Sequence, residues 1–176
     1  MHEYFSEALV LDREPYRDLD DRFSLFTKRF GKLVAKAKSS RKITSKLSGH
    51  LQPGNIVYAR FVERGGLQLV DALKIARLER NPNDLHSLHL LLSESEADPR
   101  LWNTLITRDF NWPELLKVLG WDPSEAVCAL CGGMPARSFH IASQEFFCRP
   151  CSSKSVQNTL IYLDGAARTA TQRTAE

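Results

Sequence analysis

Long apolar runs are missing from this sequence. No window approaches the roughly 20 consecutive apolar residues that a membrane-spanning helix needs. The first residues, MHEYFSEALVLDREP, also lack the basic segment and the small-residue cleavage site of a secretory signal peptide. We therefore expect a cytoplasmic protein that makes no membrane contact. In that compartment structural disulfides are disfavoured, and paired cysteines more often bind a metal or carry out redox chemistry.

Recognisable catalytic motifs are missing as well. The sequence has no Ser/His/Asp arrangement, no glycine-rich loop of the kind that holds a phosphate and no HExxH motif, and its carboxylates are scattered along the chain. We therefore expect a protein that is not an enzyme and that acts by binding.

Acidic residues are absent from one long stretch. Between Asp21 and Glu63 there is no Asp or Glu, although the chain has 21 of them. The same stretch contains ten of the 24 Lys and Arg residues, namely Arg22, Lys28, Arg29, Lys32, Lys36, Lys38, Arg41, Lys42, Lys46 and Arg60. Because like charges repel one another, such a patch contributes nothing to folding, and a polyanionic partner is the simplest explanation for it.

Strand signals dominate the N-terminal half. Apolar or β-branched runs bounded by Pro or Gly predict strands over 7–15, 22–30, 32–38, 55–64 and 67–77, with Gly65-Gly66 as the hairpin turn between the last two. The spacing of Leu47 and Leu51 indicates one short helix within 39–53. Five strands with a helix before the fourth predict a small closed barrel over 1–79, and the oligonucleotide-binding barrel, or OB fold, is the obvious candidate.

Beyond residue 80 the apolar residues recur at helical spacing. Helices are expected over 85–92, 99–110, 113–120 and 152–163, with Asp98 before Pro99 as a start signal and Gly120 as a stop signal. We therefore predict an α+β protein whose five-stranded barrel is followed by a small helical domain, 80–165, containing a four-cysteine zinc module, 128–151. Residues 166–176 are small and polar and are expected to form a disordered tail.

All four cysteines lie in that module. Cys128-x2-Cys131, sixteen further residues and Cys148-x2-Cys151 match the spacing of a zinc site. Two CxxC turns complete a tetrahedral Zn²⁺ site, which leaves no position for a reactive water and is therefore structural. An iron–sulfur cluster stays an alternative, because four thiolates suit both. Two disulfides or a redox CxxC fit the context less well, and His140 is a further candidate ligand, although a single His in such a loop is more often polar surface.

The basic stretch contains a one-sided strand. Alternation along KLVAKAK (32–38) directs the lysines to one face and the leucine and alanines to the other. The expected nucleic-acid contacts are Lys28, Arg29, Lys32, Lys36, Lys38, Arg41, Lys42 and Lys46. Five aromatic residues are interleaved with the cations, namely Phe23, Phe26, Phe30, Tyr58 and Phe61. Each is either a stacking residue or, as is more common for an aromatic side chain, part of the core.

Two sets of short motifs occur in a fixed order. The first leads from a Tyr and an Asp through a strand ending in Phe-Thr to a basic segment and then to SKL and LQP. Its residues are Tyr16, Asp18, Phe26, Thr27, Gly31, Lys32, Ala37, Lys38, Arg41, Ser45, Lys46, Leu47, Leu51, Gln52 and Pro53. The second is LGWDPSEAVCALCG (119–132) at the first cysteine pair. In combination they resemble the motifs of the RecO family of recombination mediator proteins, although Ser39-Ser40 replaces the small Gly-Ala pair that is usual there.

The resemblance implies a DNA-binding and strand-annealing recombination mediator of the RecF pathway of DNA repair. It implies binding of single- and double-stranded DNA, and work with a RecR-like partner to help RecA displace single-strand-binding protein. It also implies a bacterial, nucleoid-associated location and a contact between the tail of single-strand-binding protein and the helical region, which is shorter here. Charge alone leaves open an RNA-binding module of transcription or translation.

Overall fold

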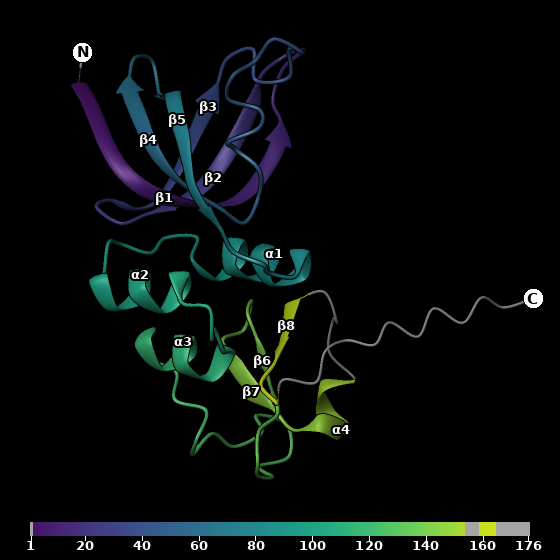
Figure 1. Ribbon diagram of the computed structural model, residues 1–176. Coiled ribbons are helices and arrows are strands. Elements are labelled where there is room, and N and C mark those ends of the chain that lie inside the picture. Colours follow the sequence, from purple (N-terminus) through teal and green to yellow (C-terminus); the bar gives the residue numbers. More distant parts are fainter. Residues whose placement is uncertain (1, 154–158, 165–176) are drawn as a thin grey trace, which may run out of the picture. The chain divides into compact units, whose positions relative to one another are not determined.

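The computed structural model describes residues 2–153 and 159–164, so the tail predicted over 166–176 lies outside the described residues (Figure 1). The chain forms two compact units, Met1–Phe110 and Asn111–Glu176. None of the helices in the described part of the chain is long and apolar enough to cross a membrane.

The first unit contains a closed five-stranded barrel. Its strands are β1 (His2–Pro15), β2 (Asp21–Thr27), β3 (Gly31–Ala37), β4 (Asn55–Glu63) and β5 (Leu67–Arg77), and they are ordered β1-β2-β3-β5-β4 around the barrel. Neighbouring strands are antiparallel except β3 and β5, which run parallel where Lys36 lies opposite Gln68. A bulge in β1 between Val10 and Asp12 helps this long strand to bend and pair with both β2 and β4. The predicted OB fold is confirmed.

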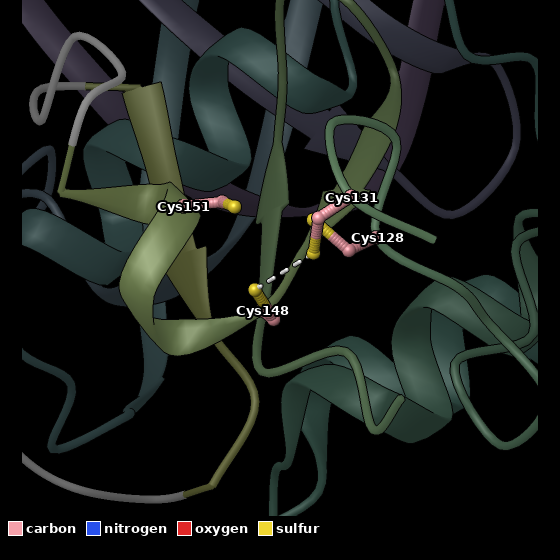
Figure 2. Close-up of side chains that lie close together, drawn as sticks. All are labelled: Cys128, Cys131, Cys148 and Cys151. Carbon is pink, nitrogen blue, oxygen red and sulfur yellow. Dashed lines mark hydrogen bonds between the residues drawn. The ribbon is translucent and has the colours of Figure 1, made fainter. Parts of the chain in front are cut away.

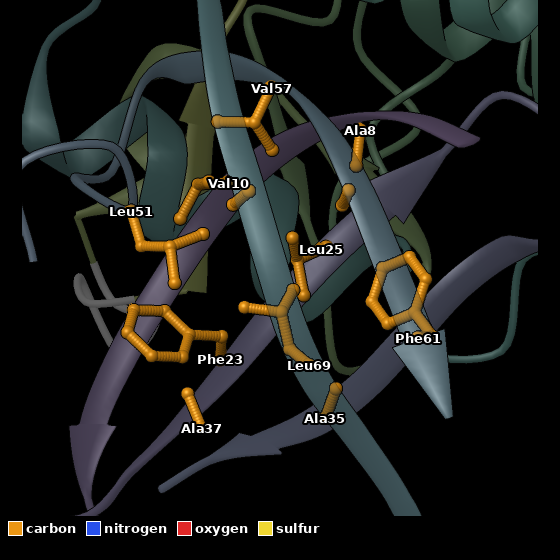
Figure 3. Close-up of a cluster of buried hydrophobic side chains, with 12 residues drawn as sticks. Ala8, Val10, Phe23, Leu25, Ala35, Ala37, Leu51, Val57, Phe61 and Leu69 are labelled. Carbon is orange, nitrogen blue, oxygen red and sulfur yellow. The ribbon is translucent and has the colours of Figure 1, made fainter. Parts of the chain in front are cut away.

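The barrel interior is filled by one side of every strand. Figure 3 shows this cluster, whose members are Ala8, Val10, Phe23, Leu25, Ala35, Ala37, Leu51, Val57, Ala59, Phe61, Leu69 and Ala72. Positions two apart along β3 share a face, so Ala35 and Ala37 point into the core whereas Val34, between Leu33 and Ala35, is half exposed. The alternation predicted for this strand is therefore confirmed.

The segment between β3 and β4 contains turns instead of the predicted short helix. Leu51 donates its backbone N–H to the carbonyl of Leu47, which is a single helical turn that does not continue. Both leucines pack against the barrel core, so their spacing does reflect a shared buried side. Hydrogen bonds with distant groups replace the helix, and one of them joins the backbone N–H of Lys74 in β5 to His50 Nδ1 over 3.1 Å.

Two helices belong to the barrel unit. They are α1 (Pro82–Leu91) and α2 (Pro99–Ile106), and each begins with a proline behind a side-chain cap, Asn81 and Asp98 respectively. The buried leucines of α1 lie on the side that packs against β1. Arg80 donates to the carbonyls of Leu105 and Thr107 at the end of α2. The compact unit that contains the barrel therefore extends through α2.

The second unit contains one helix and a small sheet. These are α3 (Trp112–Val118), β6 (Ser138–His140), β7 (Glu145–Phe147), the single turn α4 (Arg149–Ser152) and β8 (Leu160–Tyr162), with the sheet ordered β7-β6-β8. The helix predicted over 152–163 is wrong where the chain is described, because 160–162 form a strand against β6. An apolar run as short as LIY fits either structure, and here the available partner strand decides between them.

Replacing Gly31 by Ala is expected to destabilise the barrel unit by more than about 2 kcal/mol. Its φ of +67° costs an L-residue about 1–2 kcal/mol. A Cβ there also meets the backbone oxygen of Ser95 at 2.3 Å. Gly65→Ala is the matched control, because Gly65 has φ +61° and open space around it, so only the backbone cost applies. Urea denaturation of both variants checks this, and equal losses would contradict the clash.

Candidate nucleic-acid interface and metal centre

The four cysteines come together in the second unit (Figure 2). Their sulfur atoms all lie within 4.8 Å of one another, and the Sγ atoms of Cys131 and Cys148 are 3.6 Å apart. Four sulfurs about 2.3 Å from one tetrahedral ion lie about 3.8 Å from each other, so the observed spacing fits a single metal ion. The cluster of four thiols is the arrangement that the CxxC spacing predicted.

Tight turns hold each pair in place. The first pair is closed by hydrogen bonds from Gly132 N–H to the Cys128 carbonyl and from Cys128 N–H to the Gly133 carbonyl. Gly132 has φ +67°, a conformation that suits glycine. The second pair is closed by the turn of α4, in which Cys151 N–H donates to the Cys148 carbonyl. Both pairs are therefore held in tight turns by backbone hydrogen bonds.

The thiols differ in acidity although they are neighbours. Backbone N–H groups, first that of Cys148 and then those of Cys131 and Leu130, lower the pKa of the Cys128 thiol to about 6. Hydrogen bonds with the thiols of Cys148 and Cys131 raise the pKa of Cys151 to about 12. The thiolate of Cys128 is therefore stabilised by its neighbours. Ionisation of a second thiol, such as that of Cys151, is opposed by the sulfur atoms around it. Four thiolates at this spacing require a cation among them.

His140 is not part of this group. Its Nδ1 accepts the backbone N–H of Ser143 over 3.2 Å and lies 2.8 Å from the hydroxyl of the same residue. Among the described residues, only the four cysteines form a cluster suited to a metal ion. The centre can therefore hold a metal with all four positions taken by sulfur.

The cations of the acid-free stretch meet acids from elsewhere in the first unit. Lys28 lies 2.8 Å from Glu7, and Arg22 lies 3.1 Å from Glu14. Arg60 has Glu3 at 3.7 Å. The stretch is free of acids in sequence, but these three cations are opposed in space. The expectation that no acid opposes the patch is corrected in this respect.

Lys32 is committed to the fold. Its ammonium donates to the carbonyl of His89 in α1 over 2.8 Å and lies 3.2 Å from His89 Nδ1. Burial lowers the pKa of Lys32 to about 8, although the nearby Asp12 carboxylate opposes the shift. The side chain therefore ties α1 to β3 instead of standing free on the strand.

Three predicted cations keep free ammonium groups. Lys38, Lys42 and Lys46 are exposed, and their ammonium groups have no hydrogen-bond, ion-pair or ring partner among residues 2–153 and 159–164. They follow one another from the end of β3 into the loop beyond it. Together we call them the loop lysines. They are the uncompensated part of the basic stretch.

A buried carboxylate holds the start of this loop. Asp21, whose side chain is 2% exposed, accepts the Ser40 hydroxyl at 2.7 Å and has Arg41 Nε at 3.6 Å. Ser39 has φ +55° and donates its backbone N–H to the Asp20 carboxylate over 2.7 Å. Left-handed backbone favours glycine, which explains why the related motif usually has Gly at this position. Arg41 also donates to the carbonyls of Arg17 and Asp18, so it is a structural part of the loop.

Tyr16 belongs to the first motif but was not among the contacts expected from the sequence, and three cations surround its ring. Lys36 Nζ lies 4.5 Å from the ring centroid, and the guanidinium carbons of Arg22 and Arg17 lie 4.8 and 5.3 Å from it. A hydrogen bond with Lys36, together with its charge, lowers the pKa of the Tyr16 hydroxyl. The available signal was the pairing of two basic strands, because a tight β2–β3 turn puts Arg22 opposite Lys36.

The aromatic residues expected within the basic stretch divide between core and surface. Phe23, Phe26 and Phe61 are fully buried, so the core interpretation holds for them. Phe30 packs edge-on against Tyr4, with Arg29 over its ring at 5.2 Å. Tyr58 is half exposed and stacks on Phe5.

The fold and the site define a class of protein, namely an OB-fold barrel with a basic loop and a four-cysteine metal module. The family model "Recombination protein O N terminal" matches residues 1–78. The chain belongs to the RecO family, as was inferred from its motifs. It is 30% identical over 194 aligned positions to DNA repair protein RecO of Acidithiobacillus ferrooxidans, covering 92% of this chain and 76% of that protein.

Two further relatives are also named DNA repair protein RecO. DNA repair protein RecO of Myxococcus xanthus is 28% identical over 189 positions, which cover 92% of this chain and 78% of the relative. The protein of Geobacter sulfurreducens is 29% identical over 157 positions, which cover 75% of this chain and 65% of the relative. The chain therefore spans about two thirds to three quarters of the length of these relatives.

Proposed function

We propose that this protein binds DNA and anneals complementary strands in DNA repair, without catalysing a reaction. The observation that carries the proposal is the row of loop lysines, whose charges no described group of the protein neutralises. Membership of a family whose relatives are named DNA repair proteins supports DNA as the polyanion.

Counterion release supplies the driving force in this proposal. Each phosphate that a lysine neutralises frees a condensed counterion, so affinity falls steeply as salt rises. Two complementary strands repel each other through their phosphates, and a protein that neutralises part of each strand lowers the barrier to pairing. Annealing then requires a basic surface on a stable fold and no active site.

The nucleic-acid contacts we propose are a subset of the eight residues expected from the sequence. Lys36, Lys38, Lys42 and Lys46 form the proposed contact surface, because none of them has an acid partner among the described residues. Lys28 and Arg29 lie in the β2–β3 turn, at the other end of β3, and are held by Glu7 and by the Phe5 carbonyl. Lys32 and Arg41 are assigned structural roles by their contacts with His89 and Asp21.

The metal in the second unit is proposed to be one structural zinc ion, held by Cys128, Cys131, Cys148 and Cys151. Zinc prefers four tetrahedral thiolates in structural sites. A four-iron cluster is less suited, because each of its thiolates binds a different iron, whereas these sulfurs converge on one point. Zinc would supply the positive charge that the crowded thiols need, and the fold of the module would depend on it.

Partners are proposed from family membership. A RecR-like protein is the expected co-worker in helping RecA displace single-strand-binding protein, and the tail of that protein is the expected contact of the region after the barrel. The chain is shorter than the relatives quoted, so each of these contacts has to be tested on this chain itself.

A strand-annealing assay tests the proposal directly. Complementary oligonucleotides that carry a donor and an acceptor dye are mixed with the full chain, first bare and then coated with single-strand-binding protein. We expect faster duplex formation at low salt and loss of the effect at high salt. Binding without faster pairing would mean that the protein binds DNA but does not anneal complementary strands. Tighter binding of matched RNA strands, or no binding at all, would overturn the assignment to DNA.

A further inference from the structure

Two residues of like charge, Arg22 and Lys36, face each other beside the Tyr16 ring. Arg22 and Lys36 lie directly opposite each other in the β2–β3 ladder, and like charges in that position destabilise a sheet. Glu14 neutralises Arg22 at 3.1 Å. Lys36 instead has the Tyr16 ring as its partner, with Nζ 4.5 Å from the ring centroid. The ring therefore takes the place beside Lys36 that a carboxylate occupies beside Arg22 and Lys28.

A ring is a weak substitute for a phosphate. A cation beside an exposed aromatic face gains about 0.5–1 kcal/mol. A hydrogen bond between charged groups, such as an ammonium and a phosphate, is roughly twice as strong as a neutral one. A nucleic-acid backbone that reaches this face therefore draws Lys36 and Arg17 away from the ring. The part of the ring that those two cations cover is then free for another flat group, while Arg22 stays beside the ring, held by Glu14.

We propose that Tyr16 is a stacking site for one nucleobase of a single strand, and that Lys36 and Arg17 hold the phosphates beside that base. This inference rests on the proposed function, which it deepens by naming where the strand is gripped. Base–aromatic stacking contributes about 1–3 kcal/mol per base, more than the contact that it replaces. Tyr16 thereby favours single strands over duplex, whose bases are already stacked.

The position of Tyr16 fits a strand that continues along the loop lysines. Tyr16 follows β1, and Lys36 is two residues before Lys38 on the same face of the segment. Arg41 donates to the carbonyl of Arg17, which ties the base of the lysine loop to the residue next to Tyr16. The ring and the lysines are therefore parts of one connected surface.

The other exposed aromatic pair lacks these features. Phe5 and Tyr58 stack on each other with ring centroids 6.4 Å apart, so each already has an aromatic partner. Tyr58 lies opposite Glu7 in the ladder between β1 and β4, and Lys28 is paired with that carboxylate. A phosphate next to Tyr58 would meet a negative charge. Tyr58 is therefore the matched control.

The test compares three variants of the full chain, Tyr16→Leu, Tyr16→Phe and Tyr58→Leu. Each is titrated against a fluorescent oligo-dT strand and against an abasic strand of the same length, which has the phosphates but no bases. We expect Tyr16→Leu to lose about 5- to 100-fold in affinity for oligo-dT, corresponding to the stacking of one base. Its affinity for the abasic strand and its salt slope should stay unchanged. Tyr16→Phe keeps the ring and should bind like the parent, as should Tyr58→Leu.

The outcomes separate this inference from the proposed function. Equal losses on oligo-dT and the abasic strand would mean that Tyr16 only orders the cations, which overturns stacking but leaves DNA binding intact. An unchanged Tyr16→Leu variant would overturn the inference in the same way. If the parent bound neither strand, both proposals would fall. Circular dichroism of each variant excludes unfolding as the cause, and Tyr16→Phe supports the ring independently of that control.

Discussion

Removing the metal is expected to unfold the second unit while the barrel stays folded. The thiols need a cation, and among the described residues the apolar cluster beside them is small, with Phe147 and Leu160 buried against Cys128 and Tyr162 partly buried. So small a cluster cannot replace the metal, because zinc binding contributes roughly 10–16 kcal/mol in small peptides at neutral pH. The barrel has a separate core of its own, which contains none of the four cysteines.

Cys128→Ser is the sharpest variant, because Cys128 is buried and accepts several backbone N–H groups. We expect the parent to contain one zinc per chain by metal analysis and the variant to contain none. Hydrogen exchange should then become fast for the amides of β6 and β7 and stay slow for those of β2 and β3.

His140→Ala is the control for this experiment, because His140 lies between the two cysteine pairs but outside the sulfur cluster. It should keep its zinc. Loss of zinc from that variant would mean that the histidine is a ligand. Iron with visible absorbance in the parent would instead show that the centre is not a zinc site.

The barrel could be predicted from the sequence because its signals are local. Alternation along β3 and the Gly65-Gly66 turn each depend on a few neighbouring residues, and the structure has both. The cysteine cluster was equally accessible, because two CxxC turns at this spacing leave few other arrangements. In such cases the residues that make a contact can be recognised from their pattern in the sequence.

The short elements were predicted less well. Residues 160–162 form a strand only because β6 is available beside them, and that pairing spans about twenty residues of sequence. The segment 39–53 forms turns because Asp20, Asp21 and the backbone of β5 bind it from outside. A propensity or spacing argument contains no information on such partners.

The charged site shows the same limit most clearly. Lys32 and Lys38 look alike in sequence, yet one is bound to His89, 57 positions away, and the other is free. Tyr16 was missed for the same reason, since its cations come from β2, β3 and its own neighbour. The total charge of the stretch could be counted from the sequence. Which of its cations are structural and which are free depends on tertiary contacts, which the sequence does not show.

Neutralising the three loop lysines is expected to remove most of the salt-dependent affinity for DNA. The variant is Lys38→Gln, Lys42→Gln and Lys46→Gln in one chain. Each lost phosphate contact on a single strand lowers the slope of log K against log salt by roughly 0.7, so three lost contacts lower it by about 2. Because these lysines read no bases, the loss should be about equal for all sequences.

Two controls test whether the position of the charge matters. Lys32→Met removes a cation of the same stretch that is already bound to His89, so affinity and slope should change little. Arg137→Gln with Arg149→Gln removes two exposed cations beside the metal centre, where they line a hollow together with Asp164. That carboxylate opposes a phosphate, so this variant should also bind nearly like the parent.

The measurement is a salt titration of oligonucleotide binding for the parent and the three variants. A slope that is smaller by about 2 in the loop-lysine variant alone would place the phosphate path on the barrel. If the Arg137/Arg149 variant lost the affinity and the loop-lysine variant kept it, the active surface would lie on the metal module instead. The cysteines would then frame the binding surface itself, and the free ammonium groups after β3 would be solvated charges without a partner.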